Sequence, residues 1–364
     1  MSILYNDEHR AIAEESRRVL EARISRDRLL GLLERVGSFD EPFWMTAVEQ
    51  GWTGLAIPEA LGGLGLGLVE LGLVAQATGA ATAGAPFLAF GYGAARALVG
   101  STLVEAGAAW LPRLAGGEAI ATLAFAEGAA PLPPVPAVTF SEGALTGVKT
   151  VVCGGLAADA AIVWANRDGQ PVLVLAELAS VTRAQIDSYD NSRLYADLRF
   201  DRTPGTLLAQ GDAARTLALD VLAGMAVFFA HEQVGGAEAL LHIARDYAVT
   251  RKAFGQPIGA FQSIKHRLAE LYGLIEIARA NAIHAASRDG REGFLVAAAD
   301  ARLSATEAYD TAARDTIQIH GGIGVTWESG LHLHMRRARS LASEAGNPFF
   351  WEDLLVERLS GVSA

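Results

Sequence analysis

Residues Arg245–Arg267 read RDYAVTRKAFGQPIGAFQSIKHR, a stretch that predicts two helical segments joined by a tight turn. Gly255 and Pro257 force the turn, because glycine permits positive φ whereas proline fixes φ and removes a backbone donor. Arg251 ends the first predicted helix and Gln262 begins the second. A guanidinium can bind phosphate through paired hydrogen bonds, and a side-chain amide can hydrogen-bond to polar groups of a ligand, so the turn suits a phosphate-bearing ligand. The same spacing also fits an ordinary helical hairpin with a surface arginine, and spacing alone favours the hairpin.

Helical patterns continue on both sides of this turn. Apolar residues at helical spacing predict one long helix from about Asp212 up to the turn. Two more helices, 263–288 and 293–319, follow the turn, and a last one covers 348–359. These segments predict a C-terminal helical bundle over residues 211–364.

The chain before the long helix divides into a helical part and a β-rich part. Residues 1–118 predict an N-terminal helical domain that includes helices at 6–23 and 43–50. Residues 119–210 contain short β-rich runs separated by turn residues, which predict antiparallel strands and hairpins. The proline-rich segment 128–136 cannot join a central strand and is expected to be extended and exposed. The sequence therefore predicts a mainly α protein with a small middle β domain.

The composition is apolar and acidic. Of 364 residues 51% are hydrophobic, the mean hydropathy is +0.24 and the net charge is −11. The longest uncharged run, 71–95, is interrupted by Gly, Thr, Gln and Pro and is a poor membrane span, so the apolar surplus suggests a subunit interface. The acidic charge argues against nucleic-acid binding, and the single cysteine, Cys153, excludes internal disulfides and cysteine-based metal sites. The start, MSILYNDEHR, lacks a secretory pattern, and we expect a cytoplasmic protein.

Two segments carry a specific resemblance. RKAFGQPIGAFQSIKHRLAEL, around the turn, and QIHGGIGVTWESGLHLHMRRA, further on, resemble the acyl-CoA dehydrogenase family. The family plan is a helical domain, a small β domain and a C-terminal four-helix bundle. The resemblance implies FAD as the cofactor, with this chain gripping the ADP half of a flavin whose ring lies in a neighbouring subunit. The residues that match the FAD-gripping positions are Arg251, Phe254, Gln262, Gln318 and Gly322.

The family reaction needs a carboxylate base, and the resemblance places it at one of two positions. A glutamate takes the α-proton of an acyl-CoA thioester while the β-hydrogen leaves as hydride to the flavin. Here those two positions hold Ala345 and Met225. Glu344 is one residue out of register and is either a displaced base or a solvated loop carboxylate. Glu232 lies about 10.5 Å along the helix from Met225, too far to substitute, which favours a buried or interface polar residue.

The flavin-ring side of the family pattern is eroded as well. The hydroxyl-rich segment that follows the first strand in active members is replaced by FAEGAAPLPPVPAV. Val151 and Cys153 stand where an aromatic residue and a hydroxyl are expected, and Ala226 stands where an arginine near the acyl-CoA is often found. Groups used on a subunit's own flavin ring are therefore missing, whereas groups lent to a neighbour are present.

Three hypotheses follow from this pattern. The first is a subunit without the usual base that completes a partner's FAD site in a heteromeric (α2β2) acyl-CoA dehydrogenase. The second is a self-sufficient homo-oligomer with Glu344 as the displaced base, and the third is a flavin-free scaffold or binding protein. The resemblance implies a CoA thioester as substrate, in heteromeric relatives often one with a steroid side chain, and electron-transferring flavoprotein as electron acceptor. Bound flavin on the chain purified alone would favour the second hypothesis.

Overall fold

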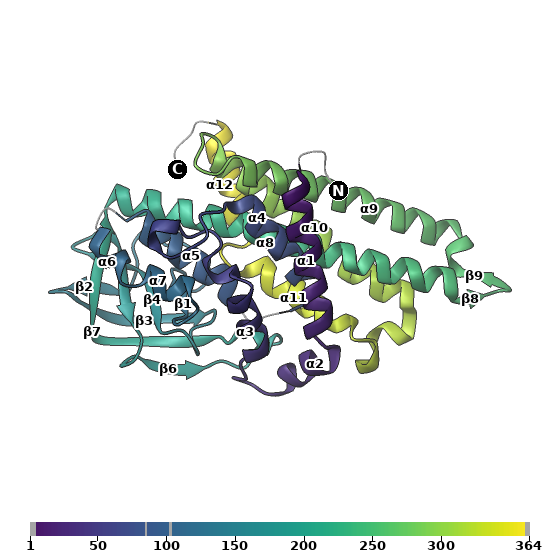
Figure 1. Ribbon diagram of the computed structural model, residues 1–364, viewed down its shortest axis with the longest axis horizontal. Helices are drawn as coiled ribbons and strands as arrows, with labels where there is room; N and C mark the ends of the chain where they lie inside the picture. The colour runs from purple at the N-terminus through teal and green to yellow at the C-terminus, as the bar shows by residue number, and fades with distance from the viewer. Residues whose placement is uncertain (1–4, 84–85, 102–103, 361–364) are drawn as a thin grey trace.

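Helices occupy both ends of the chain and flank a single large sheet (Figure 1). The computed structural model describes residues 5–83, 86–101 and 104–360. The N-terminal helical elements are α1 (Asp7–Arg23), α2 (Arg26–Glu34), α3 (Glu41–Glu49), η1 (Trp52–Gly54), η2 (Glu59–Leu61), α4 (Leu68–Ala80), α5 (Phe87–Val99), α6 (Val104–Ala108) and α7 (Leu111–Ala115). The Asn6 side chain caps α1 by accepting a hydrogen bond from the backbone N–H of His9. The helices predicted at 6–23 and 43–50 correspond to α1 and α3.

Seven strands follow and form a sheet that closes on itself. They are β1 (Ala121–Ala124), β2 (Thr139–Ser141), β3 (Ala144–Val152), β4 (Ala160–Arg167), β5 (Gln170–Glu177), β6 (Thr182–Gln185) and β7 (Ala196–Gln210), with the 3-10 turn η3 (Asn191–Arg193) between the last two. The path runs β1-β4-β2-β3-β7-β5, β5 also pairs with β4, and β6 pairs with β7. The prediction of purely antiparallel strands was wrong for β1, which pairs with β4 in parallel, and for the single parallel pair between β2 and β4.

The proline-rich segment 128–136 joins β1 to β2 and, as predicted, forms no strand within these described residues. It is exposed only in part, because Pro133 and Pro136 are buried. The carbonyl oxygen of Pro133 accepts a hydrogen bond from the indole Nε1 of Trp164 at 2.9 Å. The prediction of an exposed loop was wrong at these two prolines, and the Pro133 carbonyl satisfies the donor of the buried tryptophan.

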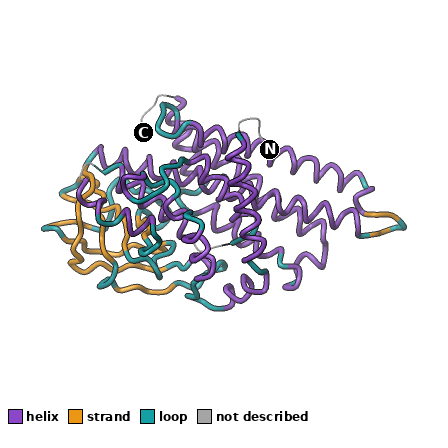
Figure 2. Tube along the Cα trace, in the orientation of Figure 1, coloured by secondary structure: helices purple, strands orange, loops and turns teal. Residues whose placement is uncertain are grey.

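The C-terminal part is built on one long helix. Its elements are α8 (Asp212–Thr250), β8 (Lys252–Ala253), β9 (Gln256–Pro257), η4 (Ile258–Ala260), α9 (Gln262–Ser287), α10 (Phe294–His320), η5 (Gly321–Val325), η6 (Trp327–Ser329), α11 (Leu331–Ser343) and α12 (Pro348–Ser360). The predicted long helix, its two successors and the last helix are confirmed; α11 was not anticipated. Figure 2 shows most strands at one end of the molecule and the β8–β9 ribbon at the other end.

Helix α8 is the centre of the core. By length and composition it is the one described helix that could cross a membrane, but 72% of its most apolar window is buried inside the fold. It packs against α4, α5, α9 and α10. Where α4 crosses α8 the backbones touch: a Cβ added at Gly79 would collide with the carbonyl oxygen of Glu232, and one at Gly235 with that of Gln76. Small residues thus let these two helices approach closely.

Candidate functional site

A cavity of about 600 Å³ lies between the sheet, α8 and the segment that follows α11. Leu123 and Phe125 line it from β1 and the residues after it. Met225 of α8 and Ala345, the two residues at the family's base positions, both line this cavity. The structure thus brings the two positions to one site, although neither residue carries a proton acceptor.

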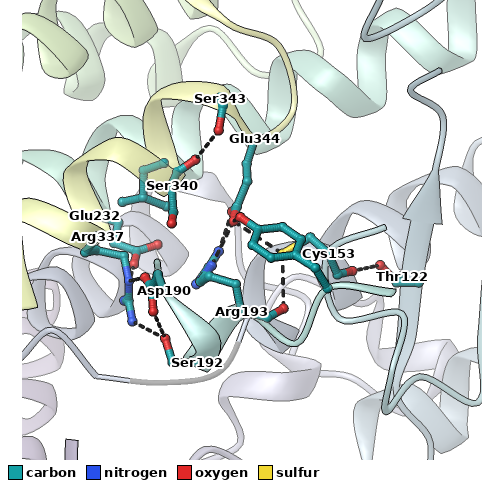
Figure 3. Close-up of polar contacts among 12 residues, drawn as sticks. Thr122, Cys153, Asp190, Ser192, Arg193, Glu232, Arg337, Ser340, Ser343 and Glu344 are labelled. Atoms are coloured by element: carbon teal, nitrogen blue, oxygen red, sulfur yellow. Dashed lines mark hydrogen bonds and ion pairs between the residues drawn. The ribbon is translucent and has the colours of Figure 1, made fainter. Parts of the chain in front are cut away.

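Glu344 turns its carboxylate into the protein, where four hydrogen bonds hold it (Figure 3). Its Oε1 accepts from Arg193 Nε at 2.9 Å, from the Tyr195 hydroxyl at 2.6 Å and from the Cys153 thiol at 3.3 Å. Its Oε2 accepts from Arg193 Nη2. The residue is only 6% exposed. The interpretation as a solvated loop carboxylate was therefore wrong, because Arg193, distant in sequence, supplies a buried partner that spacing could not reveal.

The electrostatics of this cluster keep Glu344 paired. Burial alone lowers the pKa of the Arg193 guanidinium, but the adjacent carboxylate outweighs it and holds that pKa well above its usual value. Burial raises the pKa values of the Tyr195 hydroxyl and the Cys153 thiol, and the Glu344 charge raises both further. All three donors therefore keep their protons. The Glu344 carboxylate is thus one half of a buried ion pair and has no oxygen free for a substrate proton, which a catalytic base requires.

Glu232, the other carboxylate considered, is also committed to an arginine. Its Oε1 accepts from Arg337 Nη1 at 3.0 Å, and it is 4% exposed. Arg337 lies on α11 and also donates to the carboxylate of Asp190 and to the hydroxyl of Ser192 (Figure 3). The expectation of a buried polar residue is confirmed.

Sequence reasoning missed the arginines of this region. Arg193, Arg302 and Arg337 are each no more than 3% exposed. A signal existed for Arg302, because Ala298, Arg302, Ala305 and Tyr309 share one helical face and all are buried. No comparable local pattern marks Arg193, which is the last residue of η3 and pairs with Glu344, 151 residues later.

The positions expected to hold a flavin ring do not fit one. Cys153 donates to Glu344, and Thr122 donates to the carbonyl oxygen of Cys153. Val151 is 55% exposed and has a positive φ of 54°. Ala226, at the position of the arginine often found near the acyl-CoA, is fully buried among core residues. The side chains that should orient a ring are thus absent or already engaged within this chain.

The predicted FAD-gripping residues lie at the opposite end of the molecule from the sheet (Figure 1). Arg251 follows α8, and its carbonyl oxygen accepts from the backbone N–H of Ile258 at 2.8 Å, which closes the turn. Phe254 sits at the tip with 96% of its surface exposed. Tyr247 stacks on His320 with ring centroids 4.0 Å apart, so the end of α8 lies against the end of α10.

This end suits a phosphate-bearing ligand supplied from outside the chain. Arg251, Gln262 and Gln318 are exposed, and their side chains make no hydrogen bond to any residue in the described part of the chain. The backbone at Gly321 and Gly322 is open, since a Cβ added there would meet nothing within 4 Å. Free donors beside an open backbone are what the ADP half of FAD would require.

Comparisons with known proteins agree with this architecture. The family descriptions "Acyl-CoA dehydrogenase, N-terminal domain" and "Acyl-CoA dehydrogenase, C-terminal domain" match residues 6–118 and 215–348. The acyl-CoA dehydrogenase IpdE2 of Mycobacterium tuberculosis is 35% identical over 85% of this chain and 84% of that protein, and its Mycolicibacterium smegmatis namesake is 29% identical over 94% and 96%.

Solved structures share the fold over almost the full length. A variant of the Tcur3481–Tcur3483 steroid acyl-CoA dehydrogenase superposes with a TM-score of 0.85 at 27% identity, covering 98% of each chain. The ChsE4–ChsE5 complex from Mycobacterium tuberculosis superposes with a TM-score of 0.88 at 24% identity, covering 100% of each chain. This chain, with its helical ends, closed sheet and long central helix, belongs to the acyl-CoA dehydrogenase family.

Proposed function

We propose that this chain is the subunit without a catalytic base in a heteromeric acyl-CoA dehydrogenase, where it completes the FAD site of a homologous partner. The observation that carries the proposal is the state of Glu344. Its carboxylate, the one that lies beside the base position, is saturated by Arg193, Tyr195 and Cys153. Ala345 and Met225 leave the cavity without a proton acceptor at either family position.

The exposed end of the bundle would be this chain's contribution to the partner. Arg251 would grip the FAD pyrophosphate through its guanidinium, while Gln262, Gln318 and the backbone at Gly322 would contact the rest of the ADP half. Phe254, almost fully exposed in the single chain, would be covered in the complex. Bound flavin supplies the hydride acceptor, and the partner's glutamate would remove the α-proton.

The relatives support a heteromeric assembly and a substrate class. The Tcur3481–Tcur3483 protein is described as a steroid acyl-CoA dehydrogenase, and ChsE4–ChsE5 as a complex. By analogy, this chain would form an α2β2 assembly in the cytoplasm that oxidises a CoA thioester of a bulky, steroid-like side chain. Electron-transferring flavoprotein would accept the electrons.

Co-expression with a homologous subunit that is encoded by an adjacent gene and carries the catalytic glutamate tests this proposal. We expect co-purification, flavin in the complex, and acyl-CoA-dependent dye reduction by the complex alone. Dye reduction by the single chain, abolished by Glu344→Gln, would establish the displaced-base alternative instead. A complex that forms without flavin would favour the scaffold alternative, and no complex at all would refute the assignment.

A further inference from the structure

The donors around Glu344 form a site of their own on the cavity wall. Arg193 and Tyr195 come from η3 and the residue before β7, and Cys153 follows β3, so all three belong to the sheet part of the chain. Glu344 arrives from the other side, directly after α11. The donors are buried, with 2%, 9% and 5% exposure respectively. An arginine fork aided by a hydroxyl is a geometry that proteins use to bind carboxylates.

We propose that Arg193, Tyr195 and Cys153 form a carboxylate-binding pocket that Glu344 occupies as a tethered ligand, and that this contact docks α11 on the sheet. The chemistry selects a small carboxylate: Arg193 meets both oxygens, and Tyr195 and Cys153 add donors to one of them. The pocket also has an entry path, because Tyr195, Cys153 and Glu344 all line the cavity of about 600 Å³. A free carboxylate could therefore reach the donors once the Glu344 side chain is removed.

Docking at Glu344 has a consequence for the far end of α11. The helix has 13 residues, about 20 Å of rigid rod. Arg337 holds its middle to Glu232, and Arg302 of α10 donates to the carbonyl oxygen of Glu344 at 2.9 Å. At its other end, α11 begins shortly after η5 and η6, and η5 contains Gly322. Glu344 is thus a positioning residue for the edge proposed to serve the partner's flavin, a consequence that rests on the proposed function.

Chemical rescue of Glu344→Ala tests the pocket on the single chain, independently of any partner. The variant should lose roughly 5–10 °C in melting temperature, since Arg193 is left as an unpaired buried charge. Sodium formate should restore most of this loss saturably, whereas sodium chloride at the same ionic strength should not. If the variant folds only when purified with formate, that dependence supports the pocket too. Aggregation in formate and chloride alike, or an unchanged melting temperature, would overturn it.

Two further variants are matched controls for a general effect of formate. Glu344→Gln keeps the pocket filled, so formate should not raise its melting temperature. The double variant Arg193→Met with Glu344→Leu removes both charges and fills the space with apolar atoms. It should also show no response to formate beyond that of chloride. A formate response in either control would overturn the pocket.

The heteromeric complex separates this inference from the proposed function. Glu344→Ala should weaken flavin binding by roughly three- to thirtyfold and formate should reverse the loss. Arg251→Ala should also weaken flavin binding, but formate should not restore it, because the guanidinium that is lost would contact the flavin cofactor directly. If only Arg251→Ala loses flavin, the positioning role fails while the proposed function stands. If neither variant loses flavin but formate still restores the melting temperature, the proposed function fails while the pocket stands.

Discussion

Acid should destabilise this protein through two buried histidines. His231 on α8 is fully buried, and burial is the main reason that its pKa falls to about 4. His334 on α11 is 7% exposed, and burial together with the charge of Arg337 lowers its pKa to about 3. Gln76 and the Tyr309 hydroxyl each contact the Nδ1 of one ring at 2.9 Å, so both neutral rings are held by hydrogen bonds.

The sign and size follow from proton linkage. The folded pKa of each ring lies below the unfolded value of about 6.5, so the unfolded chain binds more protons as the pH falls. The contribution of each neutral histidine to the free energy of unfolding is fully present above pH 6.5. As the pH falls below 6.5, this contribution declines by about 1.4 kcal/mol per pH unit until the pKa of the folded state is reached. At pH 5 this amounts to about 2 kcal/mol for each of His231 and His334, or about 4 kcal/mol together. The melting temperature of a chain of this length should fall by about 5 °C between pH 8 and pH 5.

The assay is the melting temperature as a function of pH for the wild type and for His231→Gln and His334→Gln. Each variant should show about half the wild-type dependence between pH 8 and pH 5, whatever its melting temperature at pH 8. His242→Gln changes an exposed histidine of α8 and is the matched control, with the wild-type dependence retained. If the double variant His231→Gln/His334→Gln kept the full acid dependence, other groups would be responsible and the reasoning would be refuted.

Three other substitutions have defined outcomes. Gly235→Ala should destabilise the fold by about 1–3 kcal/mol in urea unfolding, because α4 leaves no space for a methyl group, whereas Gly91→Ala, in open space on α5, should be neutral or slightly stabilising. Ala345→Glu alone should give no dye reduction with acyl-CoA thioesters, because a base needs a positioned flavin and thioester; clear turnover would contradict this. In the complex, Arg251→Ala should weaken flavin binding, followed as flavin retention on gel filtration, roughly ten- to a hundredfold. Arg245 lies outside the turn and forms an ion pair with Asp246, so Arg245→Ala should leave flavin retention unchanged.

The parts that sequence predicted well are those governed by local chemistry. Glycine and proline fixed the turn at β8–β9, and helical spacing located α8, α9 and α10. The state of Glu344 was out of reach because Arg193 lies on another element, and no local pattern links the two residues. The parallel pairing of β1 with β4 was not predicted for the same reason, since short β-rich runs carry little information about which strand each one will pair with.

The contrast between Glu344 and a catalytic base is a contrast in hydrogen bonding. A base must have a lone pair directed at the substrate and a pKa that allows it to take a proton. Glu344 instead has one oxygen with three donors and the other on the Arg193 fork, so its hydrogen-bonding capacity serves stability. Ala345, next in the chain, faces the cavity with a positive φ of 51° and no polar group. Both residues line the cavity, but Ala345 has no proton acceptor and the Glu344 carboxylate is fully used by its buried donors.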